Sequence, residues 1–132
     1  MAENRDRRTE KRRIGDIGED IAEKFLVKHG FSIVSRNFLR KCGEIDIICE
    51  KSGKLFFVEV KTVSRVTDSK HVDEYRPEDN IHPVKLKRME RTISLYLSES
   101  DFDGDWEISF VTVELIESTK RAKVRFLRDF AL

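Results

Sequence analysis

The sequence contains only two cysteines and two prolines among its 132 residues. Cys42 and Cys49 are seven positions apart, a spacing that matches neither a redox pair nor a zinc knuckle. We therefore expect reduced thiols in a cytoplasmic protein. No apolar run approaches the roughly 20 residues that cross a bilayer, and the first residues are charged, unlike a signal peptide. These absences exclude disulfide-rich secreted proteins and argue against a membrane location.

Charge of one sign is also lacking over the whole chain, since the formal net charge is +1. Residues 1–13, however, carry six Lys and Arg against three Asp and Glu. A basic segment of this kind either neutralises phosphates or forms a solvated tail. We expect a basic, flexible arm over residues 1–13 and one domain over residues 14–132, because a chain of this size buries one core.

The spacing of apolar residues predicts the secondary structure. It predicts helices over residues 14–29 and 83–98, the first ended by Gly30 and the second begun by Pro83. Strands are expected over residues 31–38, 44–50, 54–62, 106–116 and 121–127. The short links between the first three strands predict antiparallel neighbours. A long polar loop over residues 63–82 is expected to overhang the adjoining cleft.

Two of the predicted strands contain charged residues within otherwise apolar runs. Alternation places Glu44 and Asp46 on one face of the strand with the sequence GEIDII, and Glu59 and Lys61 on one face of the strand with the sequence FVEVK. If the strands pair, three carboxylates and one ammonium converge. Such a group can hold a divalent cation together with a phosphodiester. A salt bridge between Glu59 and Lys61 is the structural alternative, although burying two charges is costly.

The spacing Asp-x(12)-Glu-x-Lys, formed by Asp46, Glu59 and Lys61, resembles the core of the PD-(D/E)XK nuclease superfamily. The residue before Asp46 is Ile45, where the signature has proline. The order of further motifs is similar to that of the YraN-like family of uncharacterised bacterial proteins. These motifs are Gly18-Glu19, Gly30-Phe31, Arg36-Asn37, GEIDII and FVEVKT, and the resemblance covers residues 15–97.

The resemblance implies an α/β, restriction-endonuclease-like fold with a mixed, largely antiparallel central sheet flanked by helices. It also implies hydrolysis of DNA phosphodiesters that depends on Mg²⁺ or Mn²⁺. Asp46 and Glu59 would hold the metal, and Lys61 would position the attacking water or stabilise the transition state. Glu19 resembles a helix-borne carboxylate of archaeal Holliday-junction resolvases, although a glutamate favoured by the helix dipole is the plain alternative. Glu44 is expected to lie just outside the metal ligands.

Nucleic acid, and DNA in particular, is the partner that this resemblance implies. The residues expected to contact it are Lys85, Arg36, Arg12 and Arg13. The similarity to junction resolvases further implies branched DNA and a homodimer, because symmetric cutting needs two active sites. A nuclease-fold module that binds nucleic acid or a protein partner without catalysis is the alternative. A purely structural interaction domain would bind no metal.

Overall fold

The computed structural model describes residues 2–67 and 82–130. Its elements follow the order α-β-β-β-α-β-β that the sequence predicts. They are α1 (Ala2–Lys28), β1 (Ser32–Arg40), β2 (Gly43–Lys51), β3 (Lys54–Arg65), α2 (Pro83–Ser100), β4 (Trp106–Ile116) and β5 (Arg121–Phe130). Residues 68–81 of the predicted loop lie outside the described residues. Neither described helix is long and apolar enough to cross a membrane.

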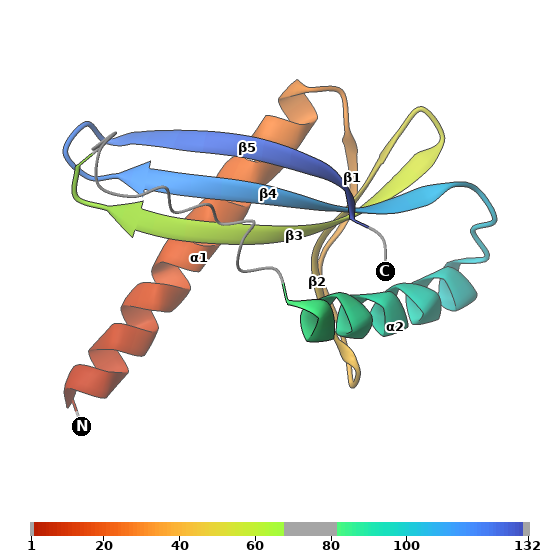
Figure 1. The fold of residues 1–132 in the computed structure, drawn as a ribbon, viewed down its shortest axis with the longest axis horizontal. Helices are drawn as coiled ribbons and strands as arrows, with labels where there is room; N and C mark the ends of the chain where they lie inside the picture. The colour runs from red at the N-terminus through yellow and green to blue at the C-terminus, as the bar shows by residue number, and fades with distance from the viewer. Residues whose placement is uncertain (1, 68–81, 131–132) are drawn as a thin grey trace.

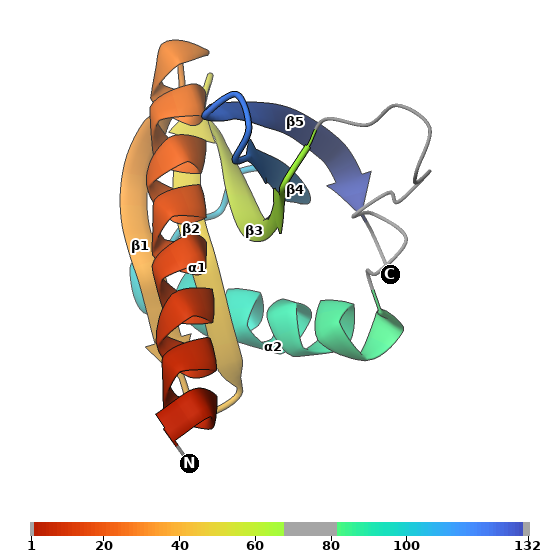
Figure 2. The ribbon, with the colours of Figure 1, turned by 90° about the vertical axis from the view of Figure 1, so that its left-hand side faces the viewer.

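The five strands form one mixed sheet in the order β1-β2-β3-β4-β5. Every neighbouring pair is antiparallel except β3 and β4, which are parallel and are connected through α2. Helix α1 packs on one face through Ala22 and Leu26, and α2 packs on the other through Met89 and Ile93 (Figure 1, Figure 2). The predicted α/β fold with a mixed central sheet between helices is thus confirmed.

Helix α1 begins at Ala2, well before the predicted start at Ile14. The basic segment therefore continues the helix, and its N-terminal part extends past the strands (Figure 1). The apolar stripe could not reveal this extension, because residues 7–13 are all exposed. At the other end, Gly30 has a φ of 92°, its amide donates to Val27, and the amide of Phe31 donates to Leu26. This arrangement confirms the predicted helix end at glycine.

Helix α1 lies unusually close to β3 at Gly18. A Cβ atom at this position would come within 1.8 Å of the Thr62 hydroxyl oxygen. A larger residue at this position would force the helix or the Thr62 side chain to shift, because a Cβ atom cannot come this close to another heavy atom.

We therefore expect Gly18→Ala to lower the free energy of unfolding by about 1–3 kcal/mol through overpacking. Gly15→Ala is the matched control, because a Cβ there meets nothing within 4 Å. This substitution should stabilise the helix by up to about 1 kcal/mol through helix propensity alone. Urea unfolding of the two variants measures both effects. Equal shifts in the same direction would contradict the close contact at Gly18.

The sheet opens between β2 and β3. The two strands pair from Lys51 and Lys54 as far as Ile47 and Val58. Beyond this point β2 continues alongside β1, whereas β3 continues alongside β4 to Arg65. Figure 1 shows β1 and β2 turning away from the other three strands. Asp46 is the neighbour of Ile47, and Glu59 is the neighbour of Val58. Both therefore lie just beyond the last pair, at the start of a gap in the sheet.

Candidate metal and phosphate site

Asp46 lies on β2 next to Ile47, the residue at which the pairing of this strand with β3 stops. Its Oδ2 accepts a hydrogen bond of 2.8 Å from the backbone amide of Val60 on β3. The carboxylate thus takes the place of the backbone acceptor that a continuing ladder would supply. This bond fixes the Asp46 side chain in the gap between the strands.

Glu59 enters the same gap from β3. Its side chain is buried, on the face of the sheet that it shares with Leu55 and Phe57 and that α2 covers. Lys85, from the first part of α2, forms an ion pair with Glu59. A salt bridge between Glu59 and Lys61 was the structural alternative from the sequence. Lys61 is exposed, however, and forms no ion pair with any of the described residues. The ammonium that meets the buried carboxylate comes from the helix instead of the strand.

A cavity of about 510 Å³ lies between the open strands and α2, and Asp46, Glu59 and Lys85 line it. Its carboxylates come from the two strands, at Glu44, Asp46 and Glu59. Its cations, Lys85 and Arg88, come from α2 and are exposed. The cavity therefore has an acidic floor and a basic rim, an arrangement that suits a cation below and a phosphate above.

Burial first, and the negative charge of Glu59 second, raise the pKa of Asp46 from its ordinary value to about 8. The charge of Glu19 adds to this effect, whereas the hydrogen bond from Val60 opposes it. Two carboxylates this close in a poorly solvated site repel each other when both are ionised. A bound cation would remove that repulsion.

The raised pKa predicts how the stability of the metal-free protein varies with pH. Because the folded protein favours protonated Asp46, stability should fall as the pH rises from about 4 towards 8. Asp46→Asn removes the charge and keeps an acceptor for Val60, so the variant should become the more stable protein at pH 8. The difference should be on the order of 1–3 kcal/mol at pH 8 and smallest near pH 4.

Thermal unfolding in EDTA across this pH range measures the difference. Asp103→Asn, at an exposed site, is the control and should follow the parent at every pH. Parallel curves for the parent and Asp46→Asn would contradict the raised pKa.

Glu19 reaches the open end of the sheet from α1. Burial raises its pKa, Arg36 counteracts this, and the charge of Glu44 raises it again. The amide nitrogen of Asn37 lies between the two carboxylates when it faces them, 2.8 Å from Glu19 and 3.1 Å from Glu44. Since α1 begins at Ala2, Glu19 lies far from the first turn, and the helix dipole does not explain its position.

Arg36, which the sequence offered as a nucleic-acid contact, is held by acidic residues of α1. Its guanidinium lies 2.8 Å from Asp20, 3.3 Å from Glu23 and 3.6 Å from Glu19. It ties β1 to α1 and offsets part of the negative charge beside the cavity. Nucleic-acid binding by Arg36 stays a prediction, and the structure gives this residue a separate role in holding Glu19.

Comparison with known proteins places the chain in a family. The model of the uncharacterised protein family UPF0102 matches residues 18–126. This chain is a UPF0102 protein, of the YraN-like group. It is 38% identical to a UPF0102 protein of Campylobacter fetus, over 87% of this chain and 90% of the relative. It is 33% identical to one of Flavobacterium psychrophilum, over 98% of this chain and 96% of the relative.

Sequence reasoning gave no role in this UPF0102 protein to Arg88, which lines the cavity, or to Asn37, which lies against Glu19 and Glu44. Arg88 lies on α2 one turn after Lys85, and Asn37 lies in β1 with a φ of 55°. Arg88 gave no signal beyond the basic strip of its helix. Asn37 did give one, because asparagine is depleted in strands and is tolerated in the left-handed region. A strained residue that touches two carboxylates is typical of a functional site.

Proposed function

We propose that this UPF0102 protein is a divalent-metal-dependent nuclease that hydrolyses DNA phosphodiester bonds. The observation that carries the proposal is the pair of half-buried Asp46 and buried Glu59 where β2 and β3 separate, below the basic rim of α2. A protein gains no stability from two carboxylates whose charges repel each other in a half-enclosed site. Their cost is explained if the site serves to bind a cation.

The residues present fit Mg²⁺ or Mn²⁺. Asp46 and Glu59 supply hard oxygen ligands, and Glu19 would assist directly or through water. Among the described residues, no group of three or more His, Cys, Asp and Glu side chains forms a ready metal cage. That finding agrees with Mg²⁺, which is commonly held by one or two carboxylates, with waters and substrate phosphate completing its coordination. When bound, the metal supplies Lewis-acid charge at the scissile phosphate.

The remaining residues of the site would bind and orient the substrate. Lys85 and Arg88 on the rim of the cavity would contact the phosphate, and Lys61 would orient the attacking water or stabilise charge on the phosphate. Lys61 is exposed and lies two residues after Glu59 on the same face of β3, so its ammonium is available to a bound strand. Glu44 and Asn37 would keep Glu19 directed at the ligands.

The deciding experiment incubates the purified protein with Mg²⁺ or Mn²⁺ and single-stranded, duplex, flapped and four-way DNA. Cleavage that EDTA abolishes supports the proposal, and the ranking of substrates tests the preference for branched DNA. Matching RNA substrates test the choice of DNA. Light scattering tests the homodimer, because a monomer that binds duplex and junction equally well would exclude symmetric junction resolution.

A binding module without catalysis is the second candidate. The ion pair between Lys85 and Glu59 favours it, because an internal cation can balance the buried carboxylate without a metal. Calorimetric titration separates the candidates: a catalytic site binds Mg²⁺ or Mn²⁺ with Asp46 and Glu59. Metal binding without cleavage of any substrate would favour the binding module over the nuclease.

Arg12 and Arg13 on the exposed part of α1 are proposed to contact DNA phosphates. Arg13 already pairs with Glu10 on the same helix, so Arg12 is expected to contribute more. Replacing both residues with glutamine should weaken DNA binding and reduce the slope of log K against log salt by up to about two units. Salt titrations of the parent and variant measure this change. Superimposable titrations would assign both residues to a solvated helix face.

A further inference from the structure

A second cavity, of about 540 Å³, lies near the C-terminal end of α1 and beside the turn that joins β2 to β3. Its aromatic residues belong to or pack against the core cluster under α1, whereas the carboxylate pair lies beneath α2. The volume falls within the range of about 300–1,000 Å³ that small-molecule sites have. Nothing in the proposed metal chemistry uses this cavity.

One end of the cavity is aromatic. Phe31 and Phe56 are buried and meet edge to face, with ring centres 4.9 Å apart. Phe126 meets Phe31 at 5.5 Å, and Phe25 lies beside the His29 ring at 4.2 Å. Phe25 and Phe126 are only half-buried and line the cavity. Their rings offer apolar surface on which a flat ligand can stack.

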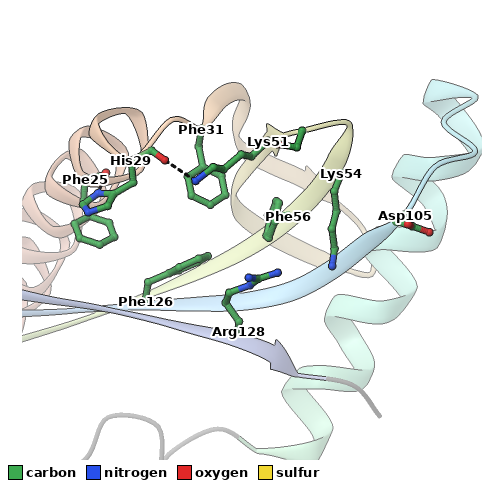
Figure 3. Close-up of a pocket in the computed structure, with 10 residues that line it drawn as sticks. Phe25, His29, Phe31, Lys51, Lys54, Phe56, Asp105, Phe126 and Arg128 are labelled. Carbon is green, nitrogen blue, oxygen red and sulfur yellow. Dashed lines mark hydrogen bonds between the residues drawn. The ribbon is translucent and has the colours of Figure 1, made fainter.

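The other end of the cavity carries charges of both signs, because Lys54, Arg128 and Asp105 line it. Figure 3 shows Phe25 and Phe126 towards one end, and Lys54 and Arg128 towards the other. Both cations contact the buried carboxylate of Glu107, Lys54 at 2.8 Å and Arg128 at 2.7 Å, so Glu107 holds their charged groups in place.

Lys51 adds a third cation, from the end of β2. Its ammonium donates to the carbonyl oxygen of His29 at 2.8 Å and lies 5.0 Å from the centre of the Phe31 ring. This partner is a neutral carbonyl and not a carboxylate. Lys51 therefore keeps its positive charge available beside the aromatic surface, where an anionic group of a stacked ligand would meet it.

We propose that this cavity binds one unpaired nucleotide, with its base against Phe25 and Phe126 and its phosphate at Lys51. A nucleotide combines a flat aromatic ring with an anionic group, which matches the aromatic rings of this cavity and the Lys51 ammonium beside them. Proteins that bind single-stranded nucleic acid combine basic groups with aromatic stacking surfaces in the same way. The nucleotide is either free or part of a strand. The proposal does not depend on cleavage.

The test is calorimetric titration of the full chain in EDTA with adenosine 5′-monophosphate, adenosine and inorganic phosphate. We expect the monophosphate to bind at least about tenfold more tightly than either of its parts. Lys51→Gln should bring the affinity for the monophosphate close to that for adenosine, and Lys51→Arg should preserve it. Phe126→Leu should weaken binding of both the monophosphate and adenosine.

Lys24→Gln, on the exposed surface of α1, is the matched control and should bind as the parent does. Melting temperatures establish that each variant is folded. Glu59→Gln should bind the monophosphate normally, which separates this cavity from the proposed metal site. Equal affinities for the monophosphate and its parts, or unchanged binding by folded Lys51→Gln and Phe126→Leu, would overturn the proposal.

A final titration compares the monophosphate with single-stranded tetradeoxyadenylate. Tighter binding of the tetranucleotide identifies the ligand as a nucleotide of a strand, and tighter binding of the monophosphate identifies a free nucleotide. Either preference supports nucleotide binding in this cavity if Lys51→Gln reduces the difference between the two affinities. A preference that Lys51→Gln leaves unchanged would place the nucleotide elsewhere on the protein.

Discussion

Glu59→Gln is expected to lower metal-dependent DNA cleavage by at least about a hundredfold and to weaken Mg²⁺ or Mn²⁺ binding markedly. The substitution keeps the shape of the side chain but removes one of the two charges that meet in the gap between β2 and β3. Groups that stabilise charge in a transition state typically contribute a factor of about 10²–10³ each. Single-turnover cleavage and calorimetric metal titration measure the two effects.

The control for this prediction is Glu90→Gln, at an exposed position of α2. It should leave both cleavage and metal affinity as in the parent. Glu59→Gln should also keep its cooperative unfolding transition, because its loss of the ion pair with Lys85 is offset by the removal of repulsion with Asp46. A folded Glu59→Gln variant with the metal affinity of the parent would defeat the assignment of this residue as a ligand.

Lys61→Met is expected to slow the chemical step by about a hundredfold while changing DNA affinity less than about threefold. The methionine keeps much of the length of the side chain and removes its charge. Lys61 is exposed and shares a face of β3 with Glu59, so its ammonium would act on bound DNA and not on the folded protein. Single-turnover rates at saturating DNA report the chemical step, and anisotropy reports affinity.

Lys85→Met is the contrasting variant. Because Lys85 pairs with Glu59, its removal should raise the affinity for metal in the absence of DNA and weaken DNA binding. Lys87→Met, on the same helix at an exposed position, should change neither quantity. If Lys61→Met cleaves at the parent rate, Lys61 has no part in the chemical step. Should Lys85→Met then be the slow variant, the helix supplies the catalytic ammonium.

Much of the fold could be predicted because local patterns agree with it. Alternation and short links located β1, β2 and β3, Gly30 marked the end of α1, and Pro83 marked the start of α2. The start of α1 could not be predicted in this way. Residues 7–13 are exposed and show no apolar stripe, so their helix depends on propensity and on continuity with the packed part of α1.

The sequence by itself determined which residues carry the candidate chemistry, because alternation along each strand assigns Asp46 and Glu59 to faces without knowledge of their neighbours. Only the tertiary structure decided that the strands part directly after Ile47 and Val58, and that Lys85 meets Glu59. It also placed Phe126 of β5 beside Phe31, far away in the sequence. Local periodicity fixes the face of an element, whereas the end of a ladder and contacts between distant segments depend on the packing of the whole sheet.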